Sequence, residues 1–241
     1  MSSAADHCRD LVRDSARDRY LASLFAPDEK RRQLFALYAL DIEIARIATA
    51  VSEPQIGLIR QQWWLDTLDG IYGGVVPAHP VAGELALVVK AAGLPQHALR
   101  GLVEARQFDL YDDPMLGLAE LEAYLGETSS ALIQMAALIL AGEAAQAGAE
   151  AAGLAGVAYG LALKVHDEPQ HLLPPGMDRP SAIAHARLRL AEARALCNTV
   201  PPAALPAFLP VSTTELYLGK QGPSQFRRQL SIWWAARHNR F

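Results

Sequence analysis

Cysteine is scarce in this chain, which has only Cys8 and Cys197 among its 241 residues. Two cysteines so far apart in the sequence provide neither a disulfide framework nor a paired-cysteine zinc site. Such sparing use of cysteine is typical of a reducing compartment, so we expect no disulfide bond.

The chain also lacks an excess of positive charge. It carries 22 lysines and arginines against 26 aspartates and glutamates, a formal net charge of −4, and no basic block interrupts this balance. Binding to a nucleic-acid backbone depends on clustered positive charge. We therefore do not expect this protein to bind nucleic acid.

No hydrophobic run is long enough to cross a bilayer. The most apolar stretch, residues 131–141, contains Gln134 and has about half of the roughly 20 residues that a spanning helix needs, so we expect a buried core helix there. Residues 1–20 have no apolar core and alternate arginines with aspartates, which is typical of neither a secretory signal nor a mitochondrial transit peptide. We therefore expect a cytoplasmic protein.

Alternating strand-like patterns are missing as well, whereas apolar residues recur at spacings of three and four almost throughout, so we predict an all-α fold. We expect Asp28 to cap the first of the long helices, and the prolines between residues 169 and 180 and between 201 and 210 to interrupt the helical pattern. Helices are predicted over about residues 28–47, 55–72, 80–93, 96–112, 118–141, 181–196 and 224–237, with a short one near 216–218.

The centre of the chain is unusually rich in small residues. Residues 141–162 are mostly alanine and glycine, which lowers helix propensity but allows neighbouring backbones to approach closely. We predict a tightly packed interior helix here. Because no repeat, linker or change of composition divides the array, we expect a single helical domain over residues 1–241.

Several short motifs, in order, resemble the squalene/phytoene synthase family. They are Asp18-Arg19-Tyr20-Leu21, Leu37-Tyr38-Ala39 with Glu43, Trp64 with Tyr72-Gly73, His79-Pro80-Val81, Glu104 with Asp109-Leu110, and Glu122-Ala123-Tyr124. The resemblance runs from about Asp18 to Tyr217. It implies a helical bundle of the isoprenoid (trans-prenyl) synthase type with a central cavity.

Enzymes of this family join two prenyl diphosphates head to head, and aspartates on two facing helices hold magnesium against the leaving diphosphates. In this sequence the two aspartates expected at the first motif fall on Ala45 and Thr49. At the second motif Asp167 matches the first aspartate, but His171 replaces the second. The resemblance therefore implies an incomplete magnesium site, and whether catalysis survives stays open.

The remnant catalytic candidates are Asp167, His171, Asp41 and Glu43. Asp41 and Glu43 are two residues apart and therefore about 200° around a helix, so they do not form one clamp. A transition-metal site made by Asp167, His171 and His166 is a less favoured alternative, because Pro169 interrupts the spacing between the two histidines. We predict no metal ligands.

The resemblance also implies substrate-binding residues. Tyr38, Asp109 and Tyr124 match cavity residues of the family, and Arg46 and Arg106 are candidates for binding a phosphate, as are Arg19 and Arg60. The competing interpretation is structural, since arginines on helices usually pair with carboxylates and a buried tyrosine often bonds to an acid. Trp63, Trp64, Trp233 and Trp234 are expected to serve packing rather than a cation-stabilising pocket.

Residues 51–72 are more similar to a divergent branch of the family that includes a mitochondrial assembly factor of respiratory complex I. Our leading hypothesis is a non-catalytic bundle without cofactor that binds an apolar lipid or a protein segment and assists assembly of a membrane complex such as complex I. The N-terminal segment favours a bacterial source, and we expect any membrane contact to be peripheral, at the inner membrane.

Two alternatives stay open at this stage. The first is a prenyltransferase of isoprenoid biosynthesis with an altered metal site, which alone would require Mg²⁺. The second is a carrier that binds prenyl diphosphates or polyprenyl lipids without turning them over.

Overall fold

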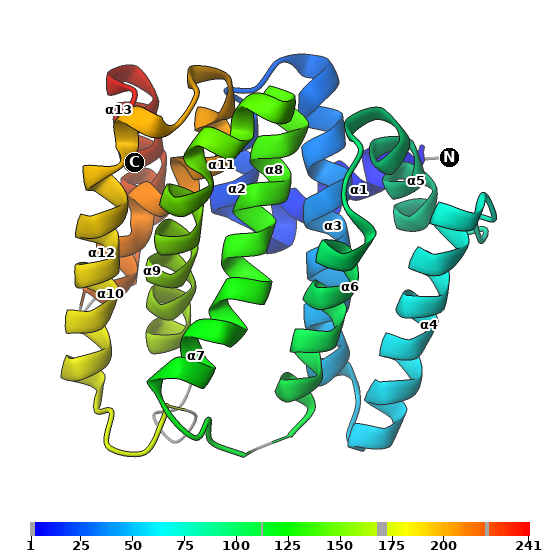
Figure 1. The fold of residues 1–241 in the computed structure, drawn as a ribbon, viewed down its shortest axis with the longest axis horizontal. Coiled ribbons are helices and arrows are strands. Elements are labelled where there is room, and N and C mark those ends of the chain that lie inside the picture. The colour runs from blue at the N-terminus through cyan, green and yellow to red at the C-terminus, as the bar shows by residue number, and fades with distance from the viewer. Residues whose placement is uncertain (1–2, 112, 168–172, 220–221) are drawn as a thin grey trace. The chain divides into compact units, whose positions relative to one another are not determined.

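The computed structural model describes residues 3–111, 113–167, 173–219 and 222–241, and every regular element in these ranges is helical (Figure 1). The all-α prediction is therefore confirmed. The helices group into two compact units, residues 1–112 and 113–241. The single domain expected from the sequence stays a prediction. The division falls just before Pro114, where the backbone is disfavoured from continuing a helix.

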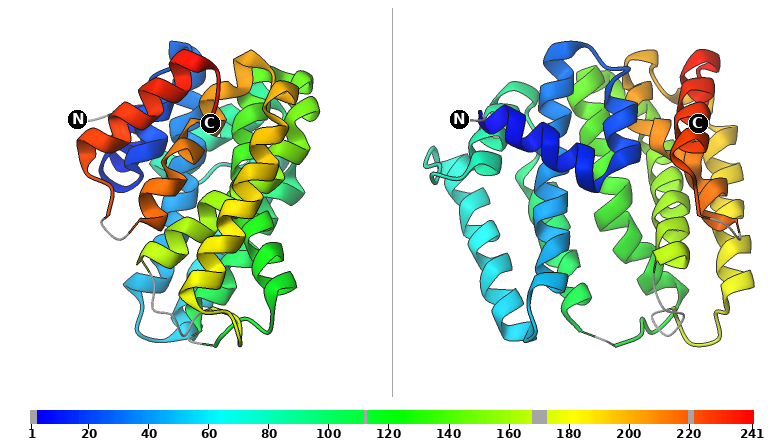
Figure 2. Two further views of the ribbon diagram at one scale, coloured as in Figure 1. Left: turned by 90° about the vertical axis from the view of Figure 1, so that its left-hand side faces the viewer. Right: turned by 180° about the vertical axis from the view of Figure 1, so that it is seen from behind.

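The first unit is built around α3. Its elements are α1 (Ala4–Ser15), α2 (Arg17–Ser23), α3 (Asp28–Ala50), α4 (Pro54–Gly73), α5 (Pro80–Ala92), α6 (Gln96–Ala105) and the 3₁₀-helix η1 (Arg106–Leu110). α3 packs against α1, α4, α5 and η1, and α1 runs across it (Figure 2). Every residue from Leu34 to Ile42 is buried, so this part of α3 is enclosed on all sides.

An ion pair between an exposed arginine and a buried glutamate joins α3 to α5. The guanidinium of Arg32 donates to both carboxylate oxygens of Glu84, at 2.7 and 2.8 Å, and the Glu84 side chain is only 8% exposed. Bidentate pairs of this kind fix orientation as well as distance. They therefore set the position of α5 against the first turns of α3.

The ends of α4 and α5 follow the predicted positions, but α1 and α2 were not predicted individually and the helix expected over residues 96–112 divides into α6 and η1. Gly74 and Gly93 end α4 and α5 in the left-handed region, with φ of +85° and +63°, which glycine adopts without steric penalty. The expected cap at Asp28 is wrong, because Pro27 is the capping residue and Asp28 is already helical. In the first turn, the carboxylate of Asp28 still interacts favourably with the helix dipole and pairs with Arg31 at 3.0 Å.

The second unit is built around α9 (Ala149–Asp167), which contacts α10 (Arg179–Ala195) along much of its length (Figure 1). α9 also packs against α8 (Ala131–Ala141) and α12 (Thr214–Leu218). The remaining elements are α7 (Leu118–Leu125), the π-helical turn η2 (Gly126–Ser130), η3 (Gly142–Gly148), η5 (Cys197–Thr199), η6 (Pro202–Ala204), α11 (Leu205–Phe208), η7 (Leu209–Thr213) and α13 (Gln225–His238).

The small residues of α9 allow a close helix contact, as predicted. At Gly156 an added Cβ would overlap the backbone of Ser130, and at Gly160 it would overlap the side chain of Ser129. The Ser130 hydroxyl donates to the main-chain oxygen of Gly153 at 2.7 Å. Gly156 and Gly160 therefore serve backbone packing against η2 rather than lining open space.

The proline-rich stretch 201–210 is helical, which corrects the predicted interruption. Pro202, Pro206 and Pro210 each lie in the first turn of a short helix, in η6, α11 and η7 respectively. Proline is tolerated in a first helical turn because the backbone N–H it lacks would have no partner there. The stretch forms a chain of short turns instead of a loop.

One apolar stretch of the described chain, Leu118–His166, is long and apolar enough by composition to cross a membrane, and half of its most apolar part is buried within the protein. The stretch is not one straight helix, because Gly142, with φ of +58°, separates α8 from η3 and α8 then packs against α9. We therefore interpret it as core packing of the second unit.

The close contact at Gly156 yields the first prediction. Gly156→Ala should destabilise the protein by about 1 to 3 kcal/mol, because the new methyl group has no room beside the Ser130 backbone. Gly153→Ala on the same helix is the matched control, since nothing lies within 4 Å of its added Cβ, and it should stabilise by up to about 1 kcal/mol. Urea unfolding measures both, and equal effects would contradict the packing described here.

Candidate functional site

A buried cluster of charged side chains lies in the first unit, around Asp41 of α3. Arg19 of α2 donates to one oxygen of its carboxylate at 2.5 Å, and Arg106 of η1 donates to the other at 3.0 Å. Arg106 also pairs with Asp109 at 3.1 Å. The Asp41 side chain is only 5% exposed, so a single carboxylate joins three elements in the interior of the unit.

The charge of Asp41 is maintained by its two arginines. Burial alone raises the pKa of this carboxyl group, but the guanidinium groups of Arg106 and Arg19 outweigh burial and hold the pKa below its ordinary value of 3.8. Asp41 is therefore an anion at neutral pH whose two oxygens both accept hydrogen bonds from arginine.

Tyr38 lies one turn before Asp41, and its ring faces the Arg19 guanidinium at 5.5 Å. Burial raises the pKa of its phenol to about 12. The hydroxyl is therefore protonated at neutral pH. Tyr38, Arg106 and Asp109, three of the predicted substrate-binding residues, thus lie together around Asp41.

The two positions at which the family resemblance predicts aspartates, Ala45 and Thr49, lie on the same face of α3 as Asp41. Asp41, Ala45 and Thr49 follow one another at intervals of four residues, so one side of the helix carries all three. Ala45 has no oxygen ligand, and the Thr49 hydroxyl donates to the main-chain oxygen of Arg46. A magnesium ion against a diphosphate requires several carboxylate oxygens, and this face offers only the two oxygens that the arginines already engage.

Glu43 and Arg46 lie on the opposite face of α3, as the spacing predicted for Glu43. They border a cleft of about 280 Å³ between α3 and α4, and the Arg46 guanidinium donates to the Ser15 hydroxyl at 2.5 Å. The cleft is lined by Glu43, Arg46, Ile47, Ala50, Arg60, Trp63, Trp64 and His79. Arg46 and Arg60 thus share this cleft, whereas the other two predicted phosphate-binding residues, Arg19 and Arg106, bind Asp41.

Aromatic rings close one side of this cleft. Trp63, Trp64 and His79 contact one another edge to face, with ring centroids 4.9 to 5.4 Å apart. Burial lowers the pKa of His79, which keeps its imidazole neutral at pH 7. Trp64 is buried and Trp63 is partly exposed, so this pair serves packing at the edge of the cleft.

The remaining predicted residues belong to the second unit. Tyr124 of α7 is buried, and the ammonium group of Lys164 lies 4.9 Å from the centre of its ring. His166 contacts the ring of Tyr217 edge to face at 5.3 Å. The side chain of Asp167 and all of His171 lie outside the described residues, so the second aspartate motif stays a prediction. Among the described residues, no three histidine, cysteine, aspartate or glutamate side chains gather as metal ligands would.

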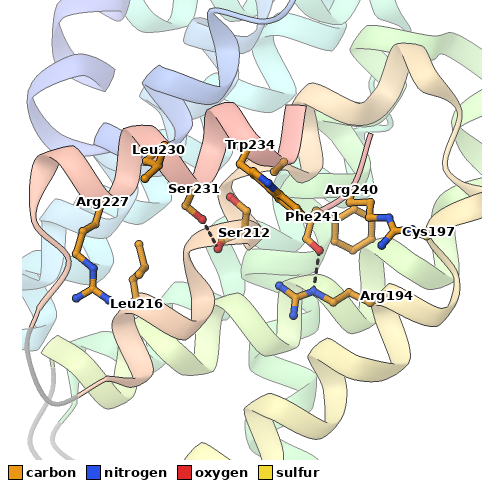
Figure 3. A pocket seen from close by; sticks show the side chains of 11 residues that line it. Arg194, Cys197, Ser212, Leu216, Arg227, Leu230, Ser231, Trp234, Arg240 and Phe241 are labelled. Atoms are coloured by element: carbon orange, nitrogen blue, oxygen red, sulfur yellow. Dashed lines mark hydrogen bonds between the residues drawn. The ribbon is translucent and has the colours of Figure 1, made fainter. Parts of the chain in front are cut away.

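Sequence reasoning missed an apolar groove in the second unit. Its volume is about 840 Å³, and α13 forms one of its walls (Figure 3). Arg194 crosses its floor to donate to the main-chain oxygen of Phe241 at 2.7 Å, and Ser231 donates to the main-chain oxygen of Ser212. The groove is lined by Arg194, Cys197, Ser212, Leu216, Arg227, Leu230, Ser231, Trp234, Ala235, Arg240 and Phe241.

A signal for this groove was present in the sequence. Trp233 and Trp234 lie in the predicted helix 224–237, and both are about half exposed rather than in the core. Arginines surround them, while no acidic residue follows Glu215. Adjacent tryptophans in a basic helix indicate a surface feature.

Comparison with solved structures places the fold among the helical isoprenoid synthases. The squalene synthase HpnC from Alicyclobacillus acidocaldarius aligns with a TM-score of 0.71 at 16% identity, over 99% of this chain and 95% of that one. A dehydrosqualene synthase crystallised with a ligand aligns with a TM-score of 0.73 at 14% identity, over 98% of this chain and 96% of that one.

Comparison of the amino-acid sequence with known protein families shows the family of this chain. The family model described as squalene/phytoene synthase matches residues 12–179, and the chain belongs to this family. Two of its curated relatives are named NADH dehydrogenase (ubiquinone) complex I, assembly factor 6. The Homo sapiens protein is 33% identical over 89% of this chain and 73% of its own length, and the Bos taurus protein is 32% identical over 89% and 72%.

The Asp41 cluster yields a prediction about stability. Asp41→Asn removes the charge that two interior arginines share and should destabilise the protein by about 3 to 5 kcal/mol. Asp69→Asn is the control, because Asp69 forms an exposed pair with Arg100 that contributes about 1 kcal/mol or less. Urea unfolding at pH 7 distinguishes them, and equal losses would show that Asp41 has no special structural role.

The same carboxylate predicts a dependence on pH. Because the pKa of Asp41 is lower in the folded protein than in the unfolded chain, its contribution is complete above about pH 4 and is lost as the pH falls through the folded value. The stability difference between the wild type and Asp41→Asn should therefore shrink below pH 4. A difference that stays constant down to pH 2 would contradict the pairing.

The two cysteines should differ in reactivity. Cys8 is 1% exposed and burial raises the pKa of its thiol to about 12, whereas Cys197 lines the groove of the second unit. Only the thiolate reacts, so a maleimide should label Cys197 in the folded protein and Cys8 only after unfolding. Peptide mapping after labelling reads out both sites, and rapid native labelling of Cys8 would disprove its placement.

Proposed function

We propose that this protein assists the assembly of an NADH dehydrogenase of the complex I type, as a synthase-like helical bundle that does not condense prenyl diphosphates. The observation that carries the proposal is the identity of 33% over 89% of the chain to a relative named complex I assembly factor 6. Identity at this level extends through both helical units rather than one motif.

The charge cluster of the first unit supports the same proposal. A head-to-head prenyltransferase requires carboxylates that can hold magnesium on two facing helices, as the family resemblance implies. On α3 the only carboxylate of the relevant face is Asp41, and Arg19 and Arg106 bind both of its oxygens. The donor set does not fit magnesium, so the alternative of an altered prenyltransferase has no support on this helix.

The proposal extends to partners and location. An assembly factor of this type would contact a subunit or a lipid of the membrane complex, and we place the protein in a bacterial cytoplasm, peripheral to the inner membrane. The carrier hypothesis is compatible with the groove of the second unit, but no observation favours a prenyl lipid as its occupant.

Deletion of the gene tests the proposal. Membranes of the deletion strain should lose most of the assembled NADH dehydrogenase on native gels, together with NADH:quinone activity, while succinate dehydrogenase serves as the internal control. Normal assembly in the deletion strain would overturn the proposed role.

Complementation separates assembly from catalysis. The wild-type gene and the Asp167→Ala variant should restore assembly equally, because the proposal assigns no diphosphate chemistry to the second motif. Rescue by the wild type alone, with Asp167→Ala folded and present at the same level, would indicate that a catalytic step is required.

A further inference from the structure

The outer face of α13 is apolar and aromatic. Phe226 is 71% exposed, Leu230 51%, Trp233 54% and Trp234 50%. Their spacing of three, four and seven residues places them along one side of the helix, while Ile232 and Ala235 on the other side are buried in the second unit. We call these four exposed residues the aromatic stripe.

The charged side chains of the C-terminal segment, residues 216–241, have one sign. Residues 216–241 contain no aspartate or glutamate, and Arg227, Arg237 and Arg240 accompany the stripe. Within the part of the chain that the structure describes, none of these three arginines forms an ion pair. Arg227, Arg237 and Arg240 therefore place positive charge beside the exposed aromatic rings.

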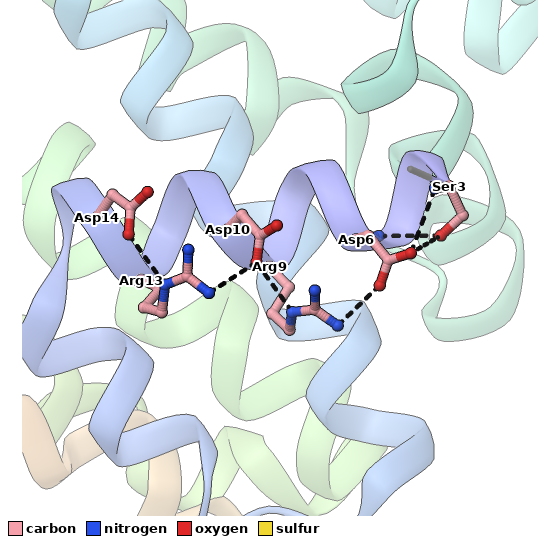
Figure 4. Close-up of polar contacts among 6 residues, drawn as sticks. All are labelled: Ser3, Asp6, Arg9, Asp10, Arg13 and Asp14. Carbon is pink, nitrogen blue, oxygen red and sulfur yellow. Dashed lines mark hydrogen bonds and ion pairs between the residues drawn. The ribbon is translucent and has the colours of Figure 1, made fainter. Parts of the chain in front are cut away.

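The contrast with α1 shows that this charge is not general to the surface. On α1, Arg9 and Arg13 each pair with two of the aspartates at positions 6, 10 and 14, over 2.7 to 3.1 Å (Figure 4). Aspartates of the same helix therefore neutralise both arginines. Among the described residues, Arg227, Arg237 and Arg240 form no ion pairs of this kind.

The groove extends the apolar surface. Leu230 and Trp234 belong both to the aromatic stripe and to the groove wall, with Arg227 near one end and Arg240 near the other (Figure 3). Apolar surface with cationic groups at its borders is complementary to a layer of acyl chains beneath anionic headgroups.

We propose that α13 is an interfacial helix that binds the surface of a membrane containing anionic phospholipids. Its 14 residues span about 21 Å, which is too short to cross a bilayer but suits a helix lying in the interface. Tryptophan is favoured at the boundary between headgroups and acyl chains, and arginines can extend from the stripe to lipid phosphates. The inference stands independently of the complex I role.

Vesicle co-sedimentation of the full chain tests the proposal. The wild type should bind vesicles of phosphatidylcholine with phosphatidylglycerol and should bind pure phosphatidylcholine only weakly. Its tryptophan emission should shift to the blue on binding, and raising the salt from 0.05 to 0.5 M should weaken the interaction because surface charges are screened.

Variants of α13 separate the apolar from the electrostatic contribution to vesicle binding. Trp233→Ala with Trp234→Ala should weaken binding at least tenfold and remove the blue shift. Replacing Arg227, Arg237 and Arg240 by glutamine should weaken binding by about fivefold per arginine. Because the replaced side chains are exposed, the circular dichroism spectra and unfolding curves of both variants should match those of the wild type.

Matched controls come from the first unit. Ile59→Ala with Val75→Ala removes two apolar side chains of comparable exposure, and Arg9→Gln with Arg13→Gln removes paired arginines. Both controls should bind vesicles as the wild type does.

Absence of wild-type binding to phosphatidylglycerol vesicles, or equal losses of binding in the control and α13 variants, would overturn the proposal. A stripe covered by a second copy of the chain would appear instead as a concentration-dependent dimer without vesicle binding, which also overturns it.

Discussion

The first unit depends on the carboxylate of Asp41. Removing a charged group from water is unfavourable unless charge and hydrogen bonds replace the lost hydration, and here two guanidinium groups do so from opposite sides. The arrangement ties α2, α3 and η1 to one point. It also decides what this face of α3 can do chemically, because a carboxylate held by two arginines is unavailable to a cation.

The synthase fold is maintained here by packing that requires no metal. α3 is buried on all sides over much of its length, and the glycines of α9 allow η2 to approach its backbone closely. These contacts are made by apolar side chains, main-chain atoms, serine hydroxyl groups and the ion pairs of Asp41. They explain how the chain can keep the fold of the aligned squalene synthase over nearly its full length although alanine and threonine stand where the family resemblance predicts the first pair of aspartates.

Much of this fold could be predicted from the sequence. Helical periodicity with Pro54, Gly74, Pro80 and Gly93 located the ends of α4 and α5, because these residues act on the local backbone. The pairing of Asp41 with Arg19 and Arg106 could not be predicted, because it joins residues 22 and 65 positions apart. Sequence reasoning named Asp41 as a remnant ligand and Arg106 as a phosphate contact, and only tertiary structure brings them together.

The short helices of residues 202–213 were also beyond sequence reasoning, whereas α12 matches the short helix predicted near residues 216–218. The groove of the second unit was missed as well. Prolines in first turns look like interruptions in a sequence, and a groove requires knowledge of which helix faces meet. The most direct test of the account is magnesium-dependent diphosphate release from farnesyl and geranylgeranyl diphosphate by the purified, folded protein. We predict no release above that of a protein-free control. Release that Asp167→Ala abolishes would contradict the account and would show that prenyl diphosphate chemistry survives in this scaffold.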